Sequence, residues 1–289
     1  DLLTKVPVLP ATTLAHDCYS GMFYGCTSLT QAPVLPATTL ANHCYNQMFY
    51  GCTSLTQASA LPATTLANYC YYQMFRGCTS LTQASALPAT TLADHCYYYM
   101  FDGCTSLTKA PVLPATTLVP DCYSGMFSGC TSLTQAPVLP ATTLADHCYY
   151  YMFEGCTSLT KVPALPATIL ANYCYTNMFQ GCAGLKLSTT LTNEYTQEYR
   201  IPSSGDGTTA TAALHNMFIS TGGTFAGEPS INTTYYLSAD NMIVRETEIA
   251  TLNGYVDSMI NTAVPTDNHI KELINTALST IGVAEEGAY

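Results

Sequence analysis

Hydrophobic and polar positions recur along this chain with a period of 26 residues. The repeated motif L-P-A-T-[T/I]-L begins at seven positions, Leu9, Leu35, Leu61, Leu87, Leu113, Leu139 and Leu165. No insertion or deletion interrupts this spacing. A strict period of this length predicts a stack of equivalent coils, because one coil cannot bury its apolar side chains without a neighbour in register.

Each repeat contains a segment with helical spacing. In the second repeat Leu40, Cys44 and Met48 fall at i, i+4 and i+8. Thr39 can cap the start and Gly51 can end the run, so the pattern predicts a helix of about three turns near residues 39–50.

The other half of each repeat, written CTSLTQAPVLP in the second copy, predicts a short extended segment. Leu55, Ala58 and Leu61 are its inward positions in the third copy. Pro33 lacks a backbone donor, which keeps the corresponding strand brief. A strand and a helix in every coil make an α/β repeat.

The regular repeats occupy residues 1–182, and the spacing then breaks. Met178 and Met217 are separated by more than one period, which predicts an insertion and a degenerate capping repeat over residues 183–241. Terminal repeats are expected to be atypical because one of their faces meets water.

Residues 242–289 predict two amphipathic helices, near 246–264 and 267–281. Two alternatives are open for them. They either dock on the last coil around Phe218, Phe225 and Ile231 or associate with other copies of themselves.

The motif M-F-x-G-C-T-S-L-T-x-A-P-x-L-P resembles the BspA-like leucine-rich repeats of bacterial surface proteins, over Leu2 to about Cys182. The units here are longer by about three residues and carry Met where the family has Ala before Phe. The resemblance implies a right-handed leucine-rich-repeat solenoid. It also implies an exported protein associated with the cell surface, and several members of the family act in adhesion to host proteins or other bacteria.

Composition and charge exclude some classes of partner. Only 9% of the residues are charged, and the net charge is −11. Without a basic patch the chain is a poor match for nucleic acid. No apolar run is long enough to span a membrane, and no signal peptide is present. Because Asp1 falls in the interior of a repeat, we expect an upstream segment, with an export signal as one possibility.

The cysteines and histidines do not indicate catalysis. The 14 cysteines occur as C-x7-C and C-x17-C, which are not zinc-knuckle spacings. Seven disulfides are one alternative, and free buried thiols, which we favour, are the other. His43, His95 and His147 fall in alternate coils, too far apart to share a metal ion. We therefore expect no catalytic residue, no metal site and no cofactor.

Two groups of side chains are candidate binding residues. A polar column is expected to project beside the strand ladder, formed by Gln31, Gln57, Gln83, Lys109, Gln135 and Lys161. Variable tyrosines are expected on the convex surface, of which the candidates are Tyr72, Tyr98 and Tyr150. Exposed aromatic side chains suit weak, multivalent contact with glycans or proteins.

The leading hypothesis is therefore a non-enzymatic extracellular or cell-surface module for adhesion, binding a host extracellular protein, a glycan or another bacterial surface component. We expect it to be a monomer. Two alternatives are open, a structural spacer that displays another domain and a component of a prophage tail or fibre.

Overall fold

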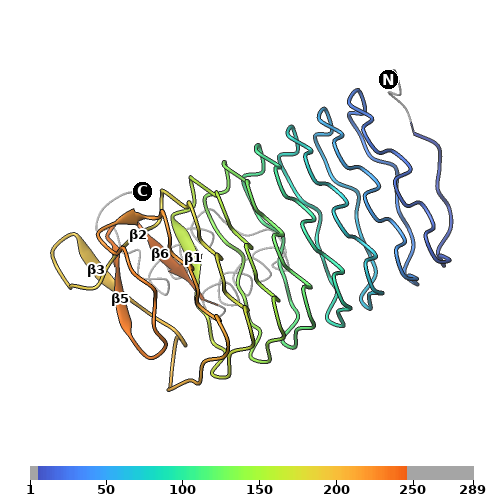
Figure 1. Ribbon diagram of the computed structural model, residues 1–289. Coiled ribbons are helices and arrows are strands. Elements are labelled where there is room, and N and C mark those ends of the chain that lie inside the picture. The colour runs from blue at the N-terminus through green and yellow to red at the C-terminus, as the bar shows by residue number, and fades with distance from the viewer. Residues whose placement is uncertain (1–5, 246–289) are drawn as a thin grey trace, which may run out of the picture. The chain divides into compact units, whose positions relative to one another are not determined.

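The structure is a computed structural model that describes residues 6–245. The two helices predicted near 246–264 and 267–281 lie outside the described residues. Within residues 6–243 the repeats form side-by-side coils along one stack, as the fold prediction required (Figure 1). We number the seven regular coils by their Met-Phe pairs, from Met22-Phe23 in coil 1 to Met178-Phe179 in coil 7.

The regular elements of the described residues are six short strands and no helix. They are β1 (Lys161–Pro163), β2 (Lys186–Ser188), β3 (Tyr195–Arg200), β4 (Gly222–Gly223), β5 (Thr234–Ser238) and β6 (Met242–Val244). Only β1 belongs to a regular coil, where it pairs with β6. The expected α/β repeat is therefore a repeat of short extended segments and turns.

In most coils the expected strand consists of single parallel bridges. Gln57 bridges to Gln31 on one side and to Gln83 on the other. A second row of bridges joins the threonine pairs, for example Thr65 with Thr91. Proline at the position of Pro33 does not set this length, because the coils with Ser59 and Ser85 in its place also form single bridges.

The predicted helix near residues 39–50 is wrong, because this segment forms interlocking turns. Cys44 N donates to Ala41 O at 3.3 Å and Met48 N to Tyr45 O at 3.2 Å, and both are turn bonds within the coil. The alternate N–H groups bond a neighbouring coil instead: Gln47 N donates to Tyr72 O of the next coil at 2.8 Å, and Tyr45 N to Cys18 O of the preceding coil at 3.0 Å. We call residues 41–52 and their equivalents the turn segments, and their bonded stack the turn ladder.

The backbone of the turn segments has a left-handed residue at every fourth position. In coil 2 these residues include His43 (φ 59°), Gln47 (φ 52°) and Gly51 (φ 70°). A non-glycine residue in this region costs of order 1–2 kcal/mol. A helix would avoid that cost but would use its N–H groups internally, and the coils would then have no backbone bonds along this face. The turn ladder bonds the neighbouring coil with every second N–H group.

Apolar columns run through the interior of the stack. Tyr45, Met48 and Phe49 are each at most 1% exposed, so the Met-Phe pair of coil 2 lies in the core, as do those of coils 3–7. The phenylalanine rings of successive coils stack with centroids 5.4–5.7 Å apart. Equivalent side chains therefore pack against one another from coil to coil, as a strict repeat requires.

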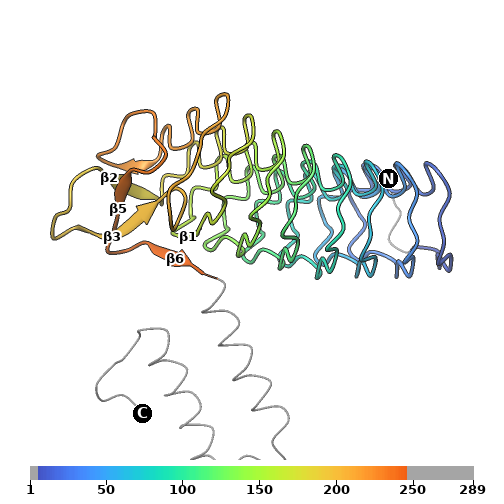
Figure 2. The ribbon, with the colours of Figure 1, turned by 90° about the horizontal axis from the view of Figure 1, so that it is seen from below.

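Residues 208–221, which we call coil 8, continue the stack after an insertion. Tyr173 N donates to Thr211 O and Phe179 N to Met217 O, both at 2.9 Å. A four-stranded sheet of order β3-β5-β2-β4 then closes this end of the stack (Figure 2). Strand β5 is antiparallel to β3 and β2, and β2 is parallel to β4.

Candidate functional site

The predicted polar column lies along the bridged extended segments. Its first four members are exposed, Gln31, Gln57, Gln83 and Lys109, and the last two are half-buried, Gln135 and Lys161. Bridges link the first four to one another and Gln135 to Lys161. The column thus offers polar side chains of nearly constant chemistry from one coil to the next.

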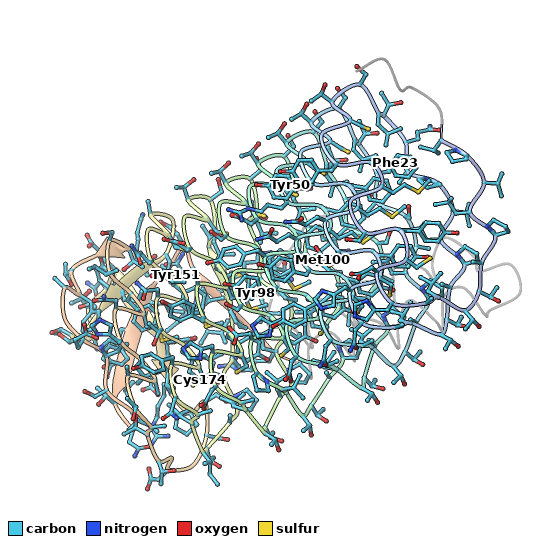
Figure 3. The ribbon with its side chains drawn as sticks, turned by 45° about the vertical axis from the view of Figure 1, so that its right-hand side comes forward. Phe23, Tyr50, Tyr98, Met100, Tyr151 and Cys174 are labelled. Carbon is cyan, nitrogen blue, oxygen red and sulfur yellow. The ribbon has the colours of Figure 1, made fainter. Side chains whose placement is uncertain are left out.

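The outward side chains of the turn segments form a second surface, which we call the turn face. Tyr72 and Tyr98 belong to it, and their rings stack with centroids 5.0 Å apart. Tyr50, Tyr98 and Tyr151 lie along this side of the stack (Figure 3). Three columns of the turn face change residue type at least twice between coils 2 and 6. They are Asn46, Tyr72, Tyr98, Ser124, Tyr150; Gln47, Gln73, Tyr99, Gly125, Tyr151; and Tyr50, Arg76, Asp102, Ser128, Glu154.

Coil 5 leaves a gap in the turn face that its neighbours fill. Its three outward residues are small, Ser124, Gly125 and Ser128, and all three are buried. A Cβ atom on Gly125 would lie 2.4 Å from the ring of Tyr99, so this ring rests directly on the glycine. Larger side chains of coils 4 and 6 therefore close over coil 5.

Tyrosine pairs border this gap on both sides. The rings of Tyr98 and Tyr99 are 4.7 Å apart, and those of Tyr150 and Tyr151 are 4.2 Å apart in an edge-on arrangement. All four side chains are half-buried, which leaves part of each ring available to a partner. The sequence predicted Tyr72, Tyr98 and Tyr150 as binding residues, and the structure brings Tyr72 and Tyr98 into direct contact.

Charged side chains line the third column of the turn face. The Arg76 guanidinium lies 5.7 Å from the ring centre of Tyr50 and 5.4 Å from that of Tyr99, and it pairs with Asp102 at 2.7 Å. Burial raises the pKa of the Asp102 carboxyl, and Arg76 opposes that shift. Burial also raises the pKa of Glu154, which accepts a hydrogen bond from the Ser128 hydroxyl at 3.4 Å. These ionisable groups were not predicted as site residues.

The histidines alternate with other side chains, as their spacing indicated. The ring of Tyr69 stacks between His43 and His95, with centroids 4.7 and 4.6 Å away. His95 Nε2 lies 3.5 Å from a carboxylate oxygen of Asp121. In residues 6–245 no group of three or more His, Cys, Asp or Glu side chains is arranged to hold a metal ion.

The cysteines are free thiols, and twelve of the fourteen are buried. Several donate to a backbone carbonyl of the preceding coil, as when Cys52 Sγ donates to Phe23 O at 3.1 Å. Burial raises the pKa of Cys44 to about 11 and that of Cys52 to about 12. A thiol of this kind is a poor nucleophile, because the thiolate is the reactive form.

Comparison with known proteins identifies the repeat. The profile of the BspA type leucine rich repeat region matches in six copies, over residues 16–134 and 44–186, and these ranges cover more than half of the chain. No curated protein and no solved structure matches the chain significantly. Within residues 6–245 there is no helix of the length and apolar character that crossing a membrane requires.

Proposed function

The chain belongs to the BspA-type leucine-rich repeat family, and on this premise we propose that it is an adhesion module that binds an extracellular protein or glycan through its turn face. The family is a family of protein-interaction repeats, not of enzymes, and it is typically associated with bacterial surfaces. For this chain we propose, beyond its family membership, the binding surface, the kind of partner and an extracellular location. We also propose that the chain acts as a monomer.

The observation that carries this proposal is the variation of the turn face. Selective binding needs a surface that differs from place to place, and the interior columns repeat without change. Between coils 3 and 6 the turn face combines stacked tyrosines with Arg76, Asp102 and Glu154. Tyrosine and arginine are the side chains most often enriched where proteins bind, because they combine large apolar contact with hydrogen bonding.

The polar column is proposed as a secondary contact. Its exposed members, Gln31, Gln57, Gln83 and Lys109, offer hydrogen bonds at regular intervals but little to distinguish one partner from another. Each contact of this kind adds little to the affinity, but many of them together increase it substantially.

We expect Tyr72→Ser, Tyr98→Ser and Tyr150→Ser together to weaken binding roughly 100-fold, because each aromatic contact contributes about 1 kcal/mol. Serine is the natural residue of the same column at Ser20 and Ser124, so the coils should tolerate it. The intact chain is first screened on an array of host extracellular proteins, mucins and glycans. Affinities of the variants are then measured for the strongest ligand.

The matched control replaces Gln57, Gln83 and Lys109 with alanine, and its effect should be smaller than that of the tyrosine variant but larger than that of any single change. An equal or larger loss in the control would place the main contact on the polar column. If the intact chain gives no signal above background on the array, the adhesion proposal fails in favour of a structural spacer.

A further inference from the structure

Among residues 6–245, coil 8 is the last coil of the turn ladder, so no described coil follows its outward N–H groups. Tyr175 N and Asn177 N of coil 7 still donate to Ala213 O at 2.9 Å and to His215 O at 3.0 Å. Within coil 8 the turn bonds use the N–H groups of alternate residues, as when Ala213 N donates to Ala210 O at 3.3 Å. The remaining N–H groups form a row that faces away from coil 7.

One N–H group of this row already holds a carboxylate. Asn216 N donates to Glu228 Oε2 at 2.9 Å, and the other oxygen of Glu228 lies 3.2 Å from His215 Nδ1. The next two donors of the row are Ala212 N and Leu214 N. Neither has a hydrogen-bond acceptor among residues 6–245.

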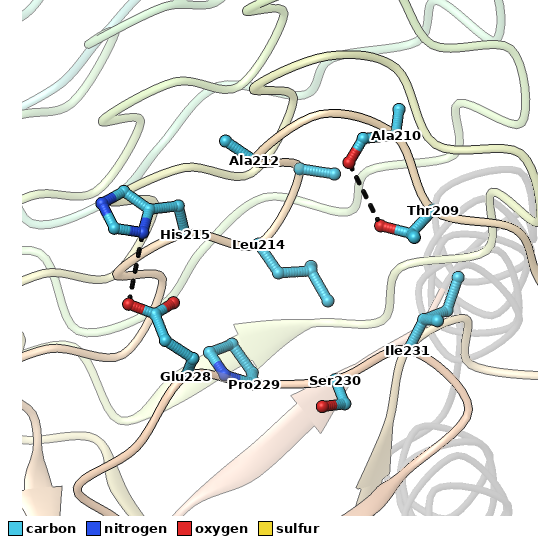
Figure 4. A pocket seen from close by; sticks show the side chains of 10 residues that line it. Thr209, Ala210, Ala212, Leu214, His215, Glu228, Pro229, Ser230 and Ile231 are labelled. Carbon is cyan, nitrogen blue, oxygen red and sulfur yellow. Dashed lines mark hydrogen bonds and ion pairs between the residues drawn. The ribbon is translucent and has the colours of Figure 1, made fainter.

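These two donors border a hollow of about 440 Å³ (Figure 4). Ala212, Leu214 and His215 line it from coil 8, and Glu228, Pro229 and Ile231 line it from the segment that crosses over that coil. The hollow therefore combines two backbone donors that have no acceptor among the described residues with an apolar wall of Leu214, Pro229 and Ile231. None of its residues belongs to the turn face of coils 2–6.

We propose that this hollow binds the C-terminal end of a partner peptide whose last side chain is apolar. Backbone N–H groups in alternating right- and left-handed conformations bind carboxylates and peptide ends. Coil 8 itself presents carbonyls two residues apart to the N–H groups of coil 7, and a peptide end has acceptors at the same spacing. The equivalent donors of coil 7, Tyr173 N and Tyr175 N, use two separate carbonyls, Thr211 O and Ala213 O, both at 2.9 Å.

The charges assign the direction of the peptide. Glu228 would repel a second carboxylate nearby, although Asn216 N–H and His215 already contact it. The terminal carboxylate therefore accepts from Ala212 N, the donor farther along the row from Glu228. The carbonyl two residues earlier accepts from Leu214 N, and the apolar side chain contacts Pro229 and Ile231.

The test uses the intact chain and the peptide acetyl-Gly-Ser-Ala-Val with a free carboxylate, compared with its C-terminal amide and with acetate. In NMR titrations the free acid should shift the amide protons of Ala212 and Leu214. Its affinity should exceed that of the amide and of acetate at least tenfold. Equal affinity for the amide or for acetate, or no shift at either amide proton, would overturn the proposal.

A matched pair of variants tests whether the negatively charged end of the peptide binds at Ala212. Ala212 has a φ of 49°, a conformation that Asp and Asn tolerate better than other side chains. Ala212→Asp should weaken peptide binding at least tenfold relative to Ala212→Asn, because only the former adds a negative charge. Equal affinities of the two variants would contradict the assigned position. If neither variant folds, hydrogen exchange of the wild-type chain decides, since the Leu214 amide should exchange rapidly alone and slowly with the peptide.

Discussion

Replacing Phe101 with alanine should lower the free energy of unfolding by about 3–5 kcal/mol, the range for removing a buried aromatic side chain. The Phe101 side chain is fully buried, and its ring lies 5.6 Å from that of Phe75 and 5.7 Å from that of Phe127. The substitution therefore removes contacts with both neighbouring coils. Because each coil of a linear stack contacts only its neighbours, the substitution should also split unfolding into two transitions. One transition belongs to the coils before Phe101 and the other to the coils after it.

Urea unfolding followed by circular dichroism measures this effect. Phe23→Ala is the matched control, because the ring of Phe23 stacks only on Phe49 among the described residues. The control should cost less than Phe101→Ala and should leave a single transition. A loss below about 1 kcal/mol for Phe101→Ala would contradict the packing of the core columns, since it falls well under the usual range.

The thiols should differ in reactivity by orders of magnitude between the folded and the unfolded chain. Burial raises the pKa of Cys52 and of Cys96 to about 12. At pH 8 the thiolate fraction is then roughly 1,000-fold below that of an ordinary cysteine with a pKa near 8.5. Labelling with a thiol reagent should therefore modify only the half-buried Cys18 and Cys26 quickly in the native chain.

All fourteen thiols should react once the chain is unfolded without a reductant. A chain with Cys18→Ser and Cys26→Ser should show no fast labelling in its native state. Fewer than four reactive thiols in the unfolded chain would mean that the cysteine columns are joined by disulfides. Raising the pH towards 11 should speed labelling of buried thiols such as Cys44, because its pKa is about 11.

The inward positions of the coils were predictable from the sequence, but the conformation of the turn segments was not. Leu55 and Leu61 are buried, as predicted for the inward positions of the extended segment. Leu40, Cys44 and Met48 recur every four residues, and this period suits both an α-helix and a row of interlocking turns. Over three turns a period of 3.6 residues cannot be distinguished from one of four. Only the hydrogen bonds between coils distinguish a row of interlocking turns from an α-helix.

The candidate sites were predictable to different degrees. Tyr72, Tyr98 and Tyr150 stood out because they vary between otherwise identical repeats. The gap at coil 5 could have been found in the same way, because CYSGMFSGC replaces three larger side chains by serine and glycine. The N–H groups of Ala212 and Leu214, which have no acceptor in the described part of the chain, leave no such signal, because they belong to the backbone and depend on how the turn ladder ends.

Hydrogen bonds from coil to coil distinguish the turn segments from a helical repeat. Scalar couplings across hydrogen bonds, measured by NMR on a chain labelled with ¹³C and ¹⁵N, test for them directly. Phe75 N donates to Met100 O at 2.9 Å, so we predict a coupling between the Phe75 amide nitrogen and the Met100 carbonyl carbon. A coupling from Phe75 to the carbonyl of Tyr71 would instead show a helix and contradict the turn ladder.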